Sequence, residues 1–326
     1  MSETSPPARR LPIRLAGPTA ILYAAGYPIG AATVAVMSPF LVISLRFAAS
    51  AVLLWGVVVA RHVLGARGGA AAPRVSPLSD RRKVGHAMIA GLLTQGVQFL
   101  GAYWGLAHGV SAGLAALVIA LNPVMTAALL AVFLGQRQSR RGVVALGLAA
   151  AAVVLACLPK IVHDHAVGPG VIAVIIAMLG LSVGGVYQGR HCSNMDPWVV
   201  NALGLTASTP VAALTLLFSP VTTTDLPRAL ILLTVMVVIS SMIGTTLYSA
   251  CIKRAGAMAA AILFAVIPAI TSLIAWAFLG EQLSILTLVG LLLGAGACAL
   301  QAASARQKGR AVTSDEAPRP PALPVR

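Results

Sequence analysis

Long apolar segments dominate the chain, and short stretches with charge, glycine or proline separate them. A transmembrane helix needs about 20 mostly apolar residues, and ten segments of the sequence meet this requirement. Strands with alternating polar and apolar residues, which a membrane β-barrel needs, do not occur in the pattern. We therefore predict an all-α integral membrane protein with ten transmembrane helices, at residues 17–36, 39–60, 84–107, 110–134, 141–159, 168–189, 197–218, 229–251, 256–279 and 284–304.

The composition agrees with this class of protein. Hydrophobic residues make up 58% of the chain and charged residues only 10%, whereas a soluble domain averages about 25% charged residues. The first 16 residues lead directly into a full-length apolar span. We therefore expect a retained first helix in the cell membrane and no cleaved signal peptide.

The net charge of +15 follows the predicted topology. With the N-terminus in the cytoplasm, 20 of the 23 Lys and Arg residues fall in cytoplasmic loops and tails. The outer loops hold only Lys160 and Arg228, and Arg46 lies inside the second span. This asymmetry is the positive-inside rule, and it predicts that both termini are cytoplasmic. Because topology explains the charge, no ordered basic surface is left for nucleic acid, and we predict no such partner.

The second half of the chain repeats the first at an offset of 145 residues. Pro123 aligns with Pro268, and residues 133–135 and 278–280 both read Phe-Leu-Gly. The same offset pairs Tyr103 with Tyr248 and Thr126 with Thr271. Because five spans precede the second copy, the two copies run in opposite directions through the membrane. An inverted repeat of this kind is typical of transporters that bind their substrate between the two halves.

The repeat divides the chain into five predicted regions. They are a cytoplasmic N-tail at 1–16, a first five-helix repeat at 17–159, an outer linker at 160–167, a second five-helix repeat at 168–304 and a disordered cytoplasmic C-tail at 305–326. The tail is rich in Ala, Pro and Arg, which is typical of segments that form no packed core.

In these features the chain resembles the EamA-like family of the drug/metabolite transporter superfamily. The resemblance implies a five-plus-five inverted fold and the transport of small metabolites, often export. Gln136 departs from the family's usual Glu, and Gly26-Tyr27-Pro28 departs from its usual aromatic signature in the first helix. The residues that carry the resemblance are Ser38-Pro39-Phe40, Leu45-Arg46-Phe47, Leu121-Asn122-Pro123 with Leu134-Gly135-Gln136, and Ile267-Pro268 with Leu279-Gly280-Glu281.

Polar residues recur at helical spacing inside several spans. In lipid such side chains are costly, so we expect them to point into the bundle. For the Ser and Thr residues, ordinary interhelical hydrogen bonding is the favoured interpretation. For the larger Gln, Asn and Tyr residues, the lining of a substrate cavity and structural packing remain equal alternatives. The predicted cavity residues are Gln95, Gln98, Tyr103, Asn122, Tyr248, Thr126 and Thr271, with Tyr27 and Tyr187 as weaker candidates.

Two prolines and one arginine have distinct predicted roles. Pro123 and Pro268 lie inside apolar spans, where each removes a backbone N–H and kinks the helix. We predict that both act as gating hinges, with a packing kink as the alternative. Arg46 either binds an anionic group of the substrate or tethers neighbouring helices. Its place in a family motif that does not depend on the substrate favours the tether.

Several kinds of chemistry find no support in the sequence. None of the eight acidic residues lies in the middle of a span, which argues against coupling through a buried carboxylate and against a cationic substrate. The four cysteines are scattered, without the spacing of a metal site. Motifs for nucleotide binding or hydrolysis do not occur. We predict no enzymatic activity, no cofactor and no metal.

The predicted function is a secondary transporter, an exporter or exchanger of small amphipathic metabolites such as amino-acid-like solutes. The expected partners are this small-molecule substrate and the lipid bilayer. A homodimer through Gly290 and Gly294 of the last span is possible, because small residues four apart allow close helix crossing. The open alternatives are a drug or lipid efflux protein of the flippase type, a membrane enzyme, and a non-enzymatic membrane scaffold.

Overall fold

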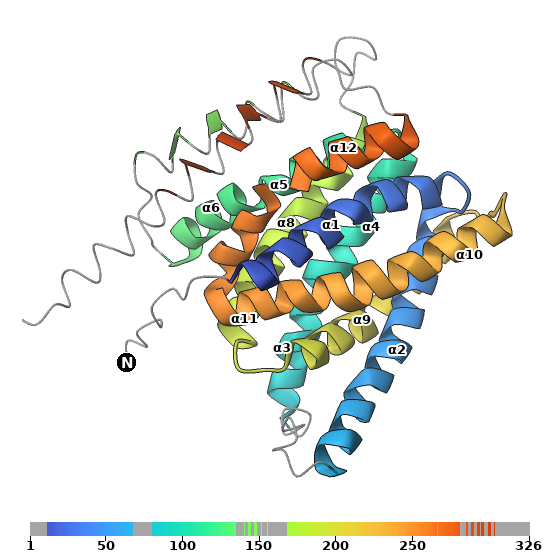
Figure 1. The fold of residues 1–326 in the computed structure, drawn as a ribbon, viewed down its shortest axis with the longest axis vertical. Coiled ribbons are helices and arrows are strands. Elements are labelled where there is room, and N and C mark those ends of the chain that lie inside the picture. Colours follow the sequence, from blue (N-terminus) through green and yellow to red (C-terminus); the bar gives the residue numbers. More distant parts are fainter. Residues whose placement is uncertain are drawn as a thin grey trace, which may run out of the picture.

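The computed structural model of the chain is a bundle of α-helices (Figure 1). It describes residues 12–67, 80–134, 168–265 and 267–280, together with scattered positions between 140 and 155 and between 285 and 303. The spans predicted at 141–159 and 284–304, the linker at 160–167, the C-tail and almost all of the N-tail lie largely or wholly outside the described residues. Gly290 and Gly294 also lie outside them, so the proposed dimer face stays a prediction.

The first half contributes helices that coincide with the first four predicted spans. The third and fourth of these spans are each built from consecutive helical segments, and one segment of the third, η2, is a π-helix. The elements are α1 (Ile13–Val34), α2 (Pro39–Arg67), α3 (Arg81–Gly91), η2 (Leu92–Val97), α4 (Gln98–Ala107), α5 (Ala112–Ala120) and α6 (Asn122–Leu134).

The second half has the same plan. A π-helical segment, η4, again lies between two α-helical segments of one long span. The elements are α8 (Pro169–His191), α9 (Pro197–Thr215), η3 (Leu216–Phe218), α10 (Leu226–Val235), η4 (Met236–Gly244), α11 (Thr245–Ile262), η5 (Leu263–Ala265) and α12 (Ile267–Leu279).

Five helical runs of the described chain are long and apolar enough to cross a membrane. They are Pro39–Leu64, Ala112–Phe133, Pro169–His191, Pro197–Phe218 and Leu226–Ala261. Large apolar side chains such as Val52, Phe133 and Phe218 point outward, each more than 70% exposed. An apolar exterior around a bundle with buried polar groups is the arrangement that lipid favours. The fold is therefore that of a multi-pass integral membrane protein.

Positive-φ glycines lie at the boundaries between the third and fourth predicted spans and between the eighth and ninth predicted spans. Gly109, with φ of 80°, lies in the turn between α4 and α5. Gly256, with φ of 85°, interrupts α11 and ends the long helix that begins at Leu226. Glycine reaches this conformation without steric cost. The break at Gly256 agrees with the predicted boundary between the spans at 229–251 and 256–279.

Both predicted hinge prolines lie where a helix is broken. α5 ends at Ala120 and α6 begins at Asn122, so Pro123 is the second residue of a new helix. Pro268 is likewise the second residue of α12, after the short η5 turn. The sequence predicted continuous kinked helices, whereas the structure begins a new helix at each proline. In a first turn the missing N–H has no intrahelical partner to lose, so proline is well tolerated there.

The halves pack closely where glycines face each other. A Cβ atom on Gly101 of α4 would lie 2.6 Å from the Ala173 carbonyl oxygen of α8. A Cβ on Gly91 of α3 would lie 1.9 Å from Cα of Gly204 on α9. Both contacts join a helix of the first repeat to a helix of the second. Small residues at such crossings let helix backbones approach in a membrane, and they position the polar residues between the repeats.

Replacing Gly91 with valine is expected to destabilise the protein, because the new side chain collides with backbone that cannot move aside. Overpacking of this kind costs about 1–3 kcal/mol and sometimes more. Gly85→Val on the same helix is the matched control, since nothing lies within 4 Å of a Cβ there. Thermal unfolding in detergent should show a clearly lower melting temperature for Gly91→Val and an unchanged one for Gly85→Val. Equal melting temperatures for the two variants would contradict the close contact of α3 with α9.

Candidate functional site: a buried polar cluster between the repeats

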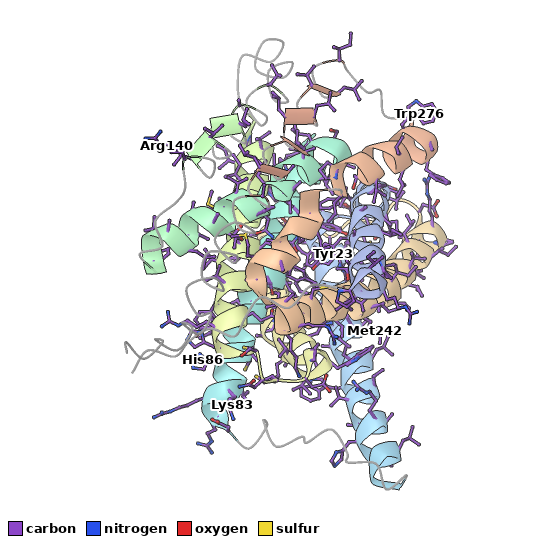
Figure 2. The ribbon with its side chains drawn as sticks, turned by 60° about the vertical axis from the view of Figure 1, so that its left-hand side comes forward. Tyr23, Lys83, His86, Arg140, Met242 and Trp276 are labelled. Carbon is purple, nitrogen blue, oxygen red and sulfur yellow. The ribbon has the colours of Figure 1, made fainter. Side chains whose placement is uncertain are left out.

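Eight of the nine predicted cavity residues are buried inside the bundle. Each of these eight side chains is no more than 6% exposed. Figure 2 shows Tyr23, which contacts this group, near the middle of the bundle, and Lys83 and His86 at one end. The eight residues are Gln95, Gln98, Tyr103, Asn122, Thr126, Tyr248, Thr271 and Tyr27, and they come from η2, α4, α6, α11, α12 and α1.

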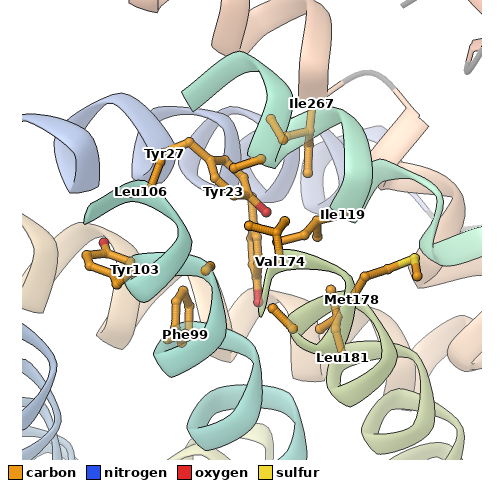
Figure 3. Close-up of a cluster of buried hydrophobic side chains, with 14 of the residues drawn as sticks. Tyr23, Tyr27, Phe99, Tyr103, Leu106, Ile119, Val174, Met178, Leu181 and Ile267 are labelled. Carbon is orange, nitrogen blue, oxygen red and sulfur yellow. The ribbon is translucent and has the colours of Figure 1, made fainter. Parts of the chain in front are cut away.

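An aromatic wall borders the cluster on one side. The ring centroids of Tyr23 and Tyr248 lie 5.6 Å apart, and Phe264 lies 5.1 Å from Tyr23 and 5.6 Å from Tyr248. Figure 3 shows Tyr23 and Tyr27 projecting from α1 toward residues of α4, α5 and α8. Tyr23 was absent from the predicted site. Its signal was the spacing of four residues from Tyr27, which places both rings on one face of the helix.

Asn122 joins α6 to α8 and α11. Its Oδ1 atom accepts hydrogen bonds from Thr126 Oγ1 at 3.1 Å and from Ser182 Oγ at 2.7 Å. The Tyr248 hydroxyl lies beside the Asn122 amide. The Nδ2 atom of Asn122 is buried and makes no hydrogen bond among the described residues. Asn122 is therefore held in place through its oxygen.

Arg46 is completely buried, and its hydrogen-bond partners in the described chain are neutral hydroxyl groups. Its Nε donates to Ser241 Oγ at 2.5 Å, Nη1 to Tyr103 Oη at 3.0 Å, and Nη2 to Ser240 Oγ at 2.8 Å. The guanidinium carbon lies 4.1 Å from the ring centroid of Phe99, a cation–π distance. These contacts tie α2 to η4 and to α4.

Five polar side-chain atoms in the bundle are buried without a partner in the described chain. Burial without a hydrogen bond costs about 1–3 kcal/mol for each group in proteins, and such groups call for an explanation such as a bound ligand or water. Within the described residues, these atoms are Tyr27 Oη, Ser50 Oγ, Gln95 Oε1, Gln98 Oε1 and Asn122 Nδ2. Four of the five belong to predicted cavity residues.

The two π-helical segments are related by the internal repeat. The offset of 145 residues places Leu92–Val97 on residues 237–242, inside η4. Gln95 of η2 then corresponds to Ser240 of η4, one of the two serines that bind Arg46. π-Helical turns are rare and are frequent at functional sites. The duplication therefore extends to a backbone feature that sequence periodicity does not reveal.

Thr271 and Asn201 have structural roles. Thr271 Oγ1 donates to the Ala24 carbonyl at 3.0 Å, which is the carbonyl that Pro28 leaves without its helical N–H. Asn201 Nδ2 donates to the Ser241 carbonyl of η4 at 2.9 Å. Hydrogen bonds of this kind satisfy backbone groups in irregular membrane helices. Asn201 was absent from the predicted residues, because a single Asn on an apolar helix gives no sign of its partner.

Tyr187 lies apart from the cluster. Its hydroxyl is 2.7 Å from Nδ1 of His86, and its ring centroid is 4.3 Å from that of His191. This aromatic group joins α3 to α8 near the N-terminal end of α3 (His86 in Figure 2). The structure therefore does not bring Tyr187 together with the other eight predicted residues.

A short β-bridge joins the two halves at the ends of their helices. Met37, between α1 and α2, pairs antiparallel with Thr223, before α10. The Ser38 N–H donates to the Thr222 carbonyl and the Thr224 N–H to the Val36 carbonyl, both at 2.9 Å. In the predicted topology, both loops lie on the outer side of the membrane. The bridge thus joins the loop between α1 and α2 to the loop before α10.

Acidic side chains of the described chain lie at helix starts. Asp80, Asp196 and Asp225 cap α3, α9 and α10 through hydrogen bonds to backbone N–H groups. These bonds hold the pKa of the Asp80 carboxyl below its ordinary value. No three His, Cys, Asp or Glu side chains of the described residues come together as metal ligands.

Comparisons with known proteins agree with this arrangement. A family model described as the EamA-like transporter family matches the chain twice, over residues 15–158 and 168–302. A solved structure titled "Crystal structure of protein" has a TM-score of 0.62 at 19% identity, over 90% of this chain and 97% of that chain. It shows a shared fold and is one of 26 matching chains. No curated protein matches. The two family matches, one on each repeat, show that the chain belongs to the EamA-like transporter family, and thus to the membrane transporters of the drug/metabolite superfamily.

Proposed function

We propose that the protein is a secondary transporter that exports or exchanges small amphipathic metabolites, such as amino-acid-like solutes, by alternating access. The observation that carries this proposal is the set of buried polar atoms without a partner in the described chain, four of which belong to predicted cavity residues. Amide and phenol groups beside aromatic rings fit a solute with both polar and apolar parts.

The proposed transport cycle uses ten helices, five in each inverted repeat, with both termini in the cytoplasm. Helices broken at Pro123 and Pro268 are the proposed hinges. α12 packs on α1 and α5 of the first repeat, and α6 packs on α8 and α11 of the second. The helices that begin at the two prolines, α6 and α12, therefore each pack against helices of the other repeat. A change in angle at either proline would move one repeat against the other and open the cluster to one side.

Exchange or uniport fits the charges better than coupling through a buried carboxylate. Within the described residues, every acidic side chain is a helix cap, and Arg46 is the only charged group at the cluster. In membrane carriers, proton relays typically use acidic residues inside the bundle. The cluster supplies hydrogen-bonding groups and one cation instead.

A ligand screen followed by flux measurements tests the proposal. Purified protein is heated in detergent with amino acids, nucleosides, sugar derivatives and quaternary amines, because a ligand of the folded state raises the melting temperature. Each solute is then tested for flux into proteoliposomes, with and without a pH gradient. The proposal is supported if an amino-acid-like solute raises the melting temperature of the protein and is also transported into the proteoliposomes. Movement of fluorescent lipid without flux of any solute would indicate a flippase instead, and movement of neither would indicate a scaffold.

A further inference from the structure

The charge of Arg46 has no counter-ion in the described part of the chain. A buried guanidinium stays protonated, and a buried charge is expensive unless a charge of opposite sign or a full set of hydrogen bonds compensates it. Its three hydrogen-bond partners are neutral hydroxyl groups. Asp196 forms an ion pair with Arg61 at 3.6 Å, and Asp80 with Lys83 at 3.4 Å, so these carboxylates are used elsewhere.

The surroundings of Arg46 are rich in donors. A guanidinium has five N–H groups, and the three hydrogen bonds from Arg46 use one on Nε, one on Nη1 and one on Nη2. One N–H on each Nη is left over. The hydroxyls of Ser240 and Ser241 accept from Arg46 and keep their own O–H groups to donate. Such a group of donors requires an acceptor, and an anion supplies one best.

Helix α1 covers this group closely. A Cβ on Gly26 would lie 3.3 Å from Ser240 Oγ, and one on Gly30 would lie 2.7 Å from Tyr103 Oη. Tyr27 lies between these glycines in the sequence and is itself buried. Helix α1 therefore covers two of the hydroxyl groups that bind Arg46, and its movement would open this side to a ligand, as alternating access requires.

We propose that Arg46, with Ser240, Ser241 and Tyr103, forms the subsite that binds a carboxylate of the transported solute. Two parallel N–H groups of a guanidinium match the two oxygens of a carboxylate. The inference rests on the proposed transport function and assigns to it a substrate class: solutes with a carboxylate group. Arg46 then has two roles, because the same bonds that hold α2 to η4 orient its donors toward the ligand.

Matched sets of solutes test the subsite. One set is leucine, 4-methylpentanoate, leucinamide and 3-methylbutylamine, and the other is phenylalanine, 3-phenylpropanoate, phenylalaninamide and 2-phenylethylamine. The first two members of each set carry a carboxylate and the last two do not. Binding is measured by thermal stabilisation and transport by flux into proteoliposomes. We expect the members without a carboxylate to bind about tenfold to a hundredfold more weakly, as the loss of hydrogen bonds to a charged group implies.

Substitutions test whether Arg46 causes the preference for solutes with a carboxylate. Arg46→Gln should abolish the preference for the carboxylate members, whereas Arg61→Gln, an exposed change on the same helix, should keep it. If Arg46→Gln does not fold, the Ser240→Ala, Ser241→Ala double variant retains the guanidinium and should weaken the preference.

Three outcomes overturn the subsite. They are equal binding of amides and acids by the wild type, an unchanged preference in Arg46→Gln or in the double serine variant, and flux confined to solutes of other classes without a carboxylate. In each of these cases transport itself still stands. No flux for any solute would remove the transport proposal, and the subsite with it.

Discussion

Replacing Asn122 with leucine is expected to reduce transport by about tenfold or more while the protein stays folded. A hydrogen bond to a ligand of ~1.5 kcal/mol corresponds to about a tenfold change in affinity. The Asn122 Nδ2 atom has no partner in the described chain, so the substitution removes a donor that the resting structure does not use, together with the Oδ1 acceptor of Thr126 and Ser182. Ser182 keeps its bond to the Met178 carbonyl at 2.9 Å after the change. Flux in proteoliposomes and abundance in the membrane are the two readouts.

The matched control is a second asparagine that is also completely buried. Asn201 uses both ends of its amide, because Nδ2 donates to the Ser241 carbonyl and Oδ1 accepts from Thr245 Oγ1 at 2.9 Å. Asn201→Leu should therefore lower the melting temperature, since it removes the hydrogen bonds of Asn201 to η4 and α11, worth about 1 kcal/mol each. Wild-type flux in Asn122→Leu, or equal destabilisation by both substitutions, would contradict the assignment of Asn122 to the substrate site.

A disulfide across the Met37–Thr223 bridge is expected to stop transport completely. The hydrogen bonds on either side of this pair show that it is a non-hydrogen-bonded antiparallel pair. Such residues have Cα atoms about 4.5 Å apart, within the range that a disulfide spans. Met37→Cys with Thr223→Cys would join the two repeats covalently at one end of the bundle. If that end must open in each cycle, oxidation should reduce flux to the background of empty liposomes.

The cross-link experiment has internal controls. All four native cysteines are replaced first, so that only the new pair can react. Each single-cysteine variant should be insensitive to oxidant, and a reductant should restore flux in the double variant. Unchanged flux in fully cross-linked protein would mean that the bridge does not open during transport, and that the repeats do not separate there.

The fold was predictable because its main signals are local and repeated. Apolar segments of helical length, the paired Pro123 and Pro268, and the duplicated Phe-Leu-Gly turns need no knowledge of contacts. The residues at which α6 and α12 begin were harder to predict from the sequence. A proline predicts a disturbed helix, but whether the chain kinks or begins a new helix depends on packing around it.

The candidate site was only partly predictable, because it depends on which helix faces are brought together. Polarity inside a span marked Gln98 and Asn122 correctly as buried. The same reasoning selected Tyr187, which contacts His86, and passed over Tyr23, which contacts Tyr248. Both are tyrosines on apolar helices, and only the packing of α1 and α8 distinguishes them.

The π-helical segments were beyond sequence reasoning for a different reason. Their apolar residues fit an ordinary helix, and the wider turn appears only in the backbone. The bonds that support η4 come from Arg46 on α2 and Asn201 on α9, which are far away in the sequence. Long-range partners of this kind cannot be read from periodicity.

The most direct test of the account is whether the centre of the bundle is reached from both sides of the membrane. Ser182 is 1% exposed and bonds to Asn122, and Ser182→Cys changes its size little. In a background without native cysteines, this variant is treated with a membrane-impermeant maleimide in vesicles of either orientation. Alternating access predicts labelling from each side, and a lower rate when a transported solute is present. Labelling from one side only, or from neither, would contradict it.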